Sequence, residues 1–113
     1  GNEIIPLHGL LDSGSDISAI SKDIAELLGL KLDGQREPAF GIGGKVDSVQ
    51  TSMAILIQQG HEKYKFNVPV KVILGSYDFP VLLGRTGFFD KFIISFDQAR
   101  EKVSLKRINR WLF

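Results

Sequence analysis

The sequence contains no cysteine and no long run of apolar residues. Without cysteine, the chain can form neither a disulfide framework nor a thiolate metal site, and it has no thiol nucleophile. No apolar run approaches the roughly 20 residues that a membrane-spanning helix needs, and the N-terminus lacks the pattern of a secretory signal peptide. We therefore expect a cytoplasmic protein without a membrane partner.

An excess of charge of one sign is also missing. The 14 Lys and Arg residues stand against 13 Asp and Glu residues, which leaves a formal net charge of +1. This balance gives no electrostatic reason to expect a nucleic-acid partner. The two histidines, His8 and His61, lie far apart in the sequence without ligand-like neighbours, so we predict no metal site and no cofactor.

What the sequence does contain is 12 glycines scattered among short β-branched and aromatic runs, which is typical of an all-β protein with many turns. At 113 residues, the chain is predicted to be a single domain spanning 1–113. Alternating apolar residues indicate two long strands, and Gly60-His61 between them indicates a turn. The expected strands cover 4–11, 17–20, 46–58, 64–74, 79–83, 93–96 and 102–106.

Two short helices are expected between these strands. The first covers 22–28 and is preceded by Ser21, a residue type that caps helix N-termini well. The second covers 86–91, with Thr86 as its possible cap. In the first helix, the apolar residues at helical spacing, which are predicted to face the core, are Ile24, Leu27 and Leu28.

Asp12 is the strongest candidate for a chemical role. It follows two leucines, which partly desolvate a carboxylate, and it precedes Ser13 and Gly14, which leave its oxygens approachable. Hydrolysis of a peptide bond by carboxylates needs two of them that share one proton and hold a water between them. The tripeptide alone is a weak signal, because Asp, Ser and Gly are also the commonest turn formers. An ordinary turn therefore stays open for this segment.

Three segments in order make a more specific pattern. The segment 10–16 (LLDSGSD) resembles the hydrophobic-hydrophobic-Asp-Ser/Thr-Gly motif of retropepsins, the single-domain aspartic proteases of retroviruses and their cellular relatives. The segment 81–85 (VLLGR) is similar to the family's second signature, and 40–44 (FGIGG) is similar to the tip of its flap. The resemblance continues through 88–97. It implies an all-β, closed acid-protease barrel with one or two short helices, working as a homodimer.

The resemblance also implies roles for single residues. Asp12 is the implied catalytic aspartate, supported by Ser13 and Gly14 in the catalytic loop. Arg85 is implied to form a structural ion pair with Asp16. Two separate solvated charges remain the alternative, because exposed ion pairs are energetically slight. The implied substrate-binding residues are Asp16, Gly41, Ile42, Gly43 and Leu82, with Phe40 and Val81 as further apolar pocket walls.

Hydrolysis by this route needs two carboxylates, but the 113 residues contain no second Asp-Ser/Thr-Gly motif. The second aspartate must then come from another copy of the chain, across a two-fold axis. We therefore predict a homodimeric aspartic endopeptidase that cleaves a peptide or protein substrate without a cofactor. The alternative is a catalytically silent retropepsin-like module for dimerisation or peptide binding.

Both ends of the chain bear on the predicted dimer. Retropepsins usually carry another strand before the motif, and only 11 residues precede Asp12 here, so we expect this N-terminal strand to be missing. The apolar residues near the C-terminus, Ile108, Trp111, Leu112 and Phe113, either pack across the dimer interface or dock on their own domain.

Overall fold

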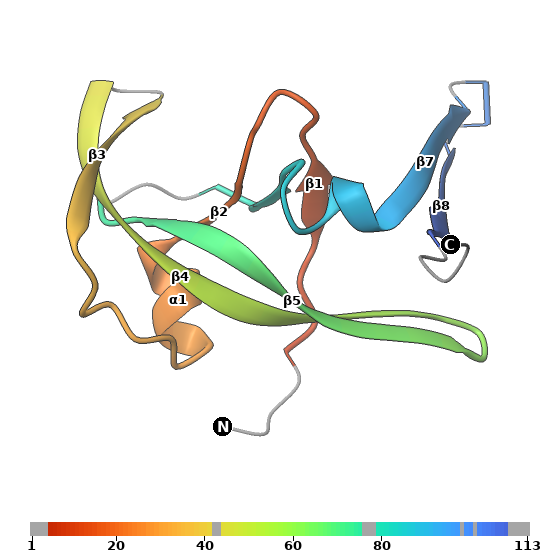
Figure 1. The fold of residues 1–113 in the computed structure, drawn as a ribbon, viewed down its shortest axis with the longest axis horizontal. Helices are drawn as coiled ribbons and strands as arrows, with labels where there is room; N and C mark the ends of the chain where they lie inside the picture. The colour runs from red at the N-terminus through yellow and green to blue at the C-terminus, as the bar shows by residue number, and fades with distance from the viewer. Residues whose placement is uncertain (1–4, 42–43, 76–78, 98, 101, 109–113) are drawn as a thin grey trace, which may run out of the picture.

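The computed structural model describes residues 5–41, 44–75, 79–97, 99–100 and 102–108. The fold is mostly β: a six-stranded sheet curls into a half-barrel, and a two-stranded sheet stands at one side of it (Figure 1). Within these ranges, no helix combines the length and the apolar character needed to cross a membrane. In chain order, the elements are β1 (Gly9–Leu11), β2 (Ser18–Ser21), α1 (Lys22–Leu27), β3 (Arg36–Gly41), β4 (Gly44–Gln59), β5 (Glu62–Ile73), β6 (Val81–Leu83), the 3₁₀-helix η1 (Phe89–Lys91), β7 (Phe92–Asp97) and β8 (Lys102–Arg107).

The six-stranded sheet brings strands from the beginning and the end of the chain together. Its strand order is β1-β6-β2-β5-β4-β3. β6 lies between β1, to which it is parallel, and β2, to which it is antiparallel. β2 runs parallel to β5, and β5, β4 and β3 follow as antiparallel neighbours. The connection between β1 and β2 therefore has to cross over the end of β6.

The hairpin of β4 and β5 is the longest element of the fold. Its strands pair continuously as far as the turn at 60–61, where Gly60 adopts a positive φ of 60°. From Val68 onward in β5, every second side chain is fully buried, as the two-residue period of a strand predicts. The two long strands and the turn predicted from the sequence are thus confirmed. The fully buried residues of β5 are Val68, Val70 and Val72.

The core lies where α1 packs against β2 and β5. Ser21 caps α1, because its Oγ accepts the N–H of Ile24 at 3.3 Å. The prediction that Leu27 faces the core is wrong, since this residue is 60% exposed. Residues advance by about 100° around a helix, so Leu27 lies about 200° from the fully buried Ala25. The buried core residues are Ile20, Ala25, Met53, Val68, Val70, Val72 and Val81.

A cluster of aromatic rings joins the two-stranded sheet to the outer half of the β4–β5 hairpin. Between ring centroids, Phe92 of β7 lies 5.7 Å from Phe66 and 6.1 Å from Tyr64, both on β5. Phe88 lies 5.3 Å from Phe92. The guanidinium of Arg107, on β8, stands 5.3 Å from the centroid of Tyr64, a cation–π contact. These contacts fix β7 and β8 against β5.

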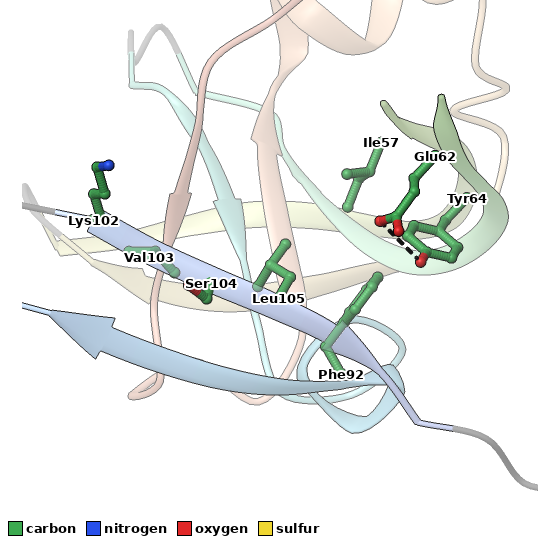
Figure 2. A pocket seen from close by; sticks show the side chains of 8 residues that line it. All are labelled: Ile57, Glu62, Tyr64, Phe92, Lys102, Val103, Ser104 and Leu105. Atoms are coloured by element: carbon green, nitrogen blue, oxygen red, sulfur yellow. Dashed lines mark hydrogen bonds between the residues drawn. The ribbon is translucent and has the colours of Figure 1, made fainter. Parts of the chain in front are cut away.

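A groove of about 480 Å³ lies beside this aromatic cluster. Figure 2 shows Ile57, Glu62 and Tyr64 of the β4–β5 hairpin on one side of it, and Phe92 and residues of β8 on the other. The lining residues come from β4, β5, β7 and β8. The groove is therefore separate from the segment that carries Asp12.

The two strands that flank the motif are shorter than expected. β1 begins at Gly9 rather than at residue 4, which lies outside the described residues, and β6 begins at Val81 rather than at Phe79. β1 and β6 pair with each other over only three residues each. In addition, Pro6 has no N–H to donate to a neighbouring strand, which disfavours a strand that extends back through residue 6.

The second predicted helix is also shorter than expected. It is a single 3₁₀ turn at Phe89–Lys91, not a helix over 86–91. Thr86 is not its cap, because the backbone of Thr86 bridges to Ile17 instead. Gly87 follows with a positive φ of 85°, a conformation that ends any helix begun before it.

Candidate active site

The segment 12–17 connects β1 to β2 across the C-terminal end of β6 (Figure 1). We call it the 12–17 loop. Backbone hydrogen bonds tie it to the residues that end and follow β6, so its shape depends on a part of the chain far away in sequence. These bonds run from Asp12 N–H to the carbonyl of Leu83 (2.9 Å), from Arg85 N–H to the carbonyl of Ser15 (2.9 Å) and from Thr86 N–H to the carbonyl of Asp16 (2.8 Å).

Asp12 is held at the start of this loop in a half-buried position. Its Oδ1 accepts the N–H of Gly14 at 3.0 Å, and its carbonyl accepts the N–H of Ser15 at 3.1 Å. Ser13 and Gly14 themselves are exposed. The Asp12 carboxylate is thus oriented by the backbone of its own loop, in a turn whose next two residues face solvent.

Gly84 lies directly beneath the 12–17 loop and is buried. A Cβ atom at this position would lie 2.6 Å from the carbonyl carbon of Ile17, 2.7 Å from its oxygen and 2.9 Å from the oxygen of Ser15. All three are backbone atoms, which cannot swing aside as the end of a side chain can. Only glycine lets the loop approach the end of β6 this closely.

Asp16 and Arg85 form an ion pair between the guanidinium and Oδ1 of the carboxylate. The pair links the middle of the 12–17 loop to the residue after Gly84. Both side chains remain accessible, with exposed fractions of 85% for Asp16 and 55% for Arg85. The pair therefore adds to a connection that the backbone already makes, at a position open to a ligand.

Removing this ion pair is expected to change the free energy of unfolding only slightly, because exposed pairs contribute about 0.2–1 kcal/mol. A double-mutant cycle of D16A, R85A and the double variant tests this by urea unfolding at one fixed protein concentration. We expect a coupling energy below about 1 kcal/mol that decreases as salt is added. A coupling energy above about 2 kcal/mol, insensitive to salt, would contradict this.

One face of β6 carries an apolar surface next to the loop. Leu82 pairs with Leu10 of β1 and with Ala19 of β2, so the three residues lie side by side and share a face of the sheet. Leu10 is 55% exposed and Leu82 half-buried. Val81 alternates to the opposite face, where it belongs to the core, so the prediction that it lines the pocket is wrong. Leu10, which was not predicted as a site residue, takes its place beside Leu82.

The predicted flap corresponds to the hairpin of β3 and β4. Its last described pair is Gly41↔Gly44, and Ile42 and Gly43 at its tip lie outside the described residues. In Figure 1, one end of this hairpin and the 12–17 loop both lie toward the top of the view. At the base of the hairpin, the hydroxyl of Ser48 donates to the carbonyl of Glu37 at 3.0 Å.

The structure thus gathers most of the predicted site residues around the end of β6. Asp12, Ser13, Gly14 and Asp16 share the 12–17 loop, and Arg85 is bound to it. Across the described ranges, no group of three or more His, Asp or Glu residues is placed to hold a metal ion. Of the apolar residues near the C-terminus, Ile108 is described and donates its N–H to the carbonyl of Lys91 at 3.0 Å, whereas Trp111, Leu112 and Phe113 lie outside the described part of the chain.

No protein-family model matches the sequence, and no curated protein matches it. Among solved structures, this chain is similar to a retropepsin-like aspartic protease from Rickettsia conorii, with a TM-score of 0.59 and 23% sequence identity. The similarity covers 78% of this chain and 72% of that one. At this level of identity, the comparison shows that the fold is retropepsin-like; the activity has to be argued from the site.

Proposed function

We propose that this chain is one subunit of a homodimeric aspartic endopeptidase, in which the Asp12 side chains of two copies act on one peptide bond. The observation that supports this best is the 12–17 loop. It holds a half-buried carboxylate at the end of β6 and is bound by its backbone to residues 83–86, within a retropepsin-like fold. An ordinary surface turn does not need such a distant anchor.

The chemistry follows from two carboxylates that share one proton. One takes a proton from a water molecule, whose oxygen forms a bond to the carbonyl carbon of the substrate, while the other donates its proton to the carbonyl oxygen. The resulting diol collapses when the amide nitrogen is protonated and the C–N bond breaks. The products are a carboxylic acid and an amine, and no covalent intermediate with the enzyme is needed.

A second copy of the chain is required because the 113 residues contain a single Asp-Ser-Gly motif. Around a two-fold axis, the same surface of each copy meets the other. Ser13 and Gly14 are exposed beside Asp12, so they are available to meet the partner's loop. The described residues form a curled sheet. The closed barrel predicted from the sequence remains part of this proposal.

The substrate is proposed to be an extended peptide lying between the β3–β4 hairpin and the 12–17 loops. The exposed Asp16 carboxylate can accept hydrogen bonds from backbone N–H groups of the peptide. Gly14, which has no side chain, lets the peptide approach closely. The apolar face that Leu10 and Leu82 share favours apolar side chains next to the cleaved bond. The flap residues Gly41, Ile42 and Gly43 keep their proposed role of covering the peptide.

A degenerate peptide library, incubated with the protein from mildly acidic to neutral pH, tests the proposed function. We expect a dimer in sedimentation experiments, and cleavage between apolar residues that depends on protein concentration as a dimer-dependent activity does. A monomer that cuts nothing even at high concentration would rule out the protease. A dimer that binds peptides but never cuts them would identify the silent binding module instead, and cleavage mainly beside charged residues would refute the apolar pocket.

A further inference from the structure

Ser18, in β2, is fully buried and bonds to the residue on which the 12–17 loop rests. Its Oγ accepts the N–H of Gly84 at 3.0 Å, across 66 residues of sequence. None of the segments 10–16, 40–44 and 81–85 includes Ser18. Its position, two residues after Asp16 at the start of β2, places it where the loop re-enters the sheet.

The Gly84 N–H needs this acceptor because β6 ends one residue earlier. The last pair of β6 with β1 is Leu11↔Leu83, and its pair with β2 is Ala19↔Leu82. Gly84 is buried, and a buried N–H without an acceptor is costly. Among the described residues, no buried side-chain nitrogen or oxygen lacks a partner, and the Ser18 hydroxyl is included.

The three buried serines of the described residues make different hydrogen bonds. Ser21 caps α1 through the N–H of Ile24, and Ser48 holds β3 to β4 through the carbonyl of Glu37. The Ser18 hydroxyl alone among these three is bonded to a residue that contacts the 12–17 loop. It therefore holds a residue whose backbone shifts are passed directly to the loop.

We infer that Ser18 is a positioning residue for Asp12. The hydroxyl holds Gly84, the backbone of Ser15 and Ile17 packs on Gly84, and the N–H of Ser15 donates to the carbonyl of Asp12. Ser18 touches neither the substrate nor the reacting water, so it acts only through this chain of contacts. The consequence for catalysis rests on the proposed function, whereas the hold on the loop does not.

The structural part of this inference is tested by amide hydrogen exchange at Gly84, Arg85 and Thr86. Ser18→Ala removes the acceptor, and Ser18→Cys replaces it by a weak one at nearly unchanged volume, in case the smaller side chain leaves the chain unfolded. In either variant, we expect these three amides to exchange about tenfold faster relative to the amides of the β4–β5 hairpin. Exchange as in the unchanged protein would overturn the inference.

Ser21→Ala is the matched control, because it also removes a buried serine hydroxyl that accepts one backbone N–H. It is expected to weaken α1 without changing the relative exchange at 84–86. With a cleaved peptide, Ser18→Ala should lower kcat about tenfold with little change in KM. Ser18→Thr, which keeps the hydroxyl, should restore most of the rate, and Ser21→Ala should retain it.

The proposed function and the role of Ser18 can be refuted separately. If the unchanged protein cleaves no peptide, the proposed function is wrong, and the exchange data still decide whether Ser18 holds the loop. If peptides are cleaved and Ser18→Ala lowers stability as much as Ser21→Ala but leaves kcat unchanged, the positioning role is refuted. Loss of kcat together with faster exchange at 84–86 supports it.

Discussion

Replacing Asp12 by Asn is expected to lower kcat/KM for peptide cleavage by about 10³-fold while leaving the chain folded. Asn has nearly the same shape, and its amide oxygen can still accept the N–H of Gly14, so the 12–17 loop keeps its local bond. What the variant loses is the carboxylate that takes and returns the proton. The measurement is the cleavage rate of a peptide selected from the library, with folding followed by circular dichroism.

Asp33→Asn is the matched control for this variant. Asp33 is an exposed carboxylate outside the 12–17 loop and the β3–β4 hairpin, so its removal changes the net charge equally without touching the site. The control should cleave at the rate of the unchanged protein. If Asp12→Asn cleaved as fast as Asp33→Asn, the assignment of Asp12 would be wrong.

A mixing experiment with the same variant tests whether the site is shared between two copies. If chains exchange freely, adding an equal amount of D12N to the active protein leaves a quarter of the dimers with two Asp12 side chains. Total activity should then fall to about half. A site contained within one chain would show no loss on mixing.

Replacing Gly84 by Ala is expected to lower the free energy of unfolding by about 3 kcal/mol or more. The added methyl would stand 2.6–2.9 Å from backbone atoms of Ile17 and Ser15, inside the range that real contacts avoid. Either the 12–17 loop moves away or β6 shifts, and each costs the backbone hydrogen bonds between them. Activity should be lost together with stability, because Asp12 begins the displaced loop.

Gly34→Ala provides the comparison for this substitution. At Gly34, the added methyl would first meet a side-chain atom of Val49 at 3.2 Å, which has to give by only a few tenths of an ångström, and φ there is not in the left-handed region. We expect a change in the free energy of unfolding within about 1 kcal/mol. Urea unfolding of both variants measures the difference, and equal values would contradict the close approach at Gly84.

Much of the fold could be predicted because local patterns and tertiary packing agree. The alternation that buries Val68, Val70 and Val72 is visible in the sequence, and so is the glycine at the turn between β4 and β5. The grouping of Asp12, Asp16 and Arg85 came from the family resemblance. The catalytic and binding roles of these residues stay predictions until the variants are measured.

The site residues that could not be predicted from the sequence are those whose position depends on which strands become neighbours. Leu10 and Leu82 share a face only because β1 and β6 pair in one register, and no local pattern specifies that pairing. Ser18 lies in the strand predicted over 17–20, and nothing in the sequence singles out its hydroxyl until Gly84 is placed beside it. Leu27 was misplaced for another reason: a helix of six residues has room for one buried face, and Ala25 occupies its centre.

Because β6 lies between β1 and β2, the surroundings of Asp12 cannot assemble before residues 82–86 have been synthesised. The residues that hold the loop follow it by 66 or more positions, and contacts between such distant segments form late and slowly. The motif is thus synthesised well before the residues that anchor it. Under the proposed function, a nascent chain therefore has no formed site until the residues that anchor the 12–17 loop have been synthesised.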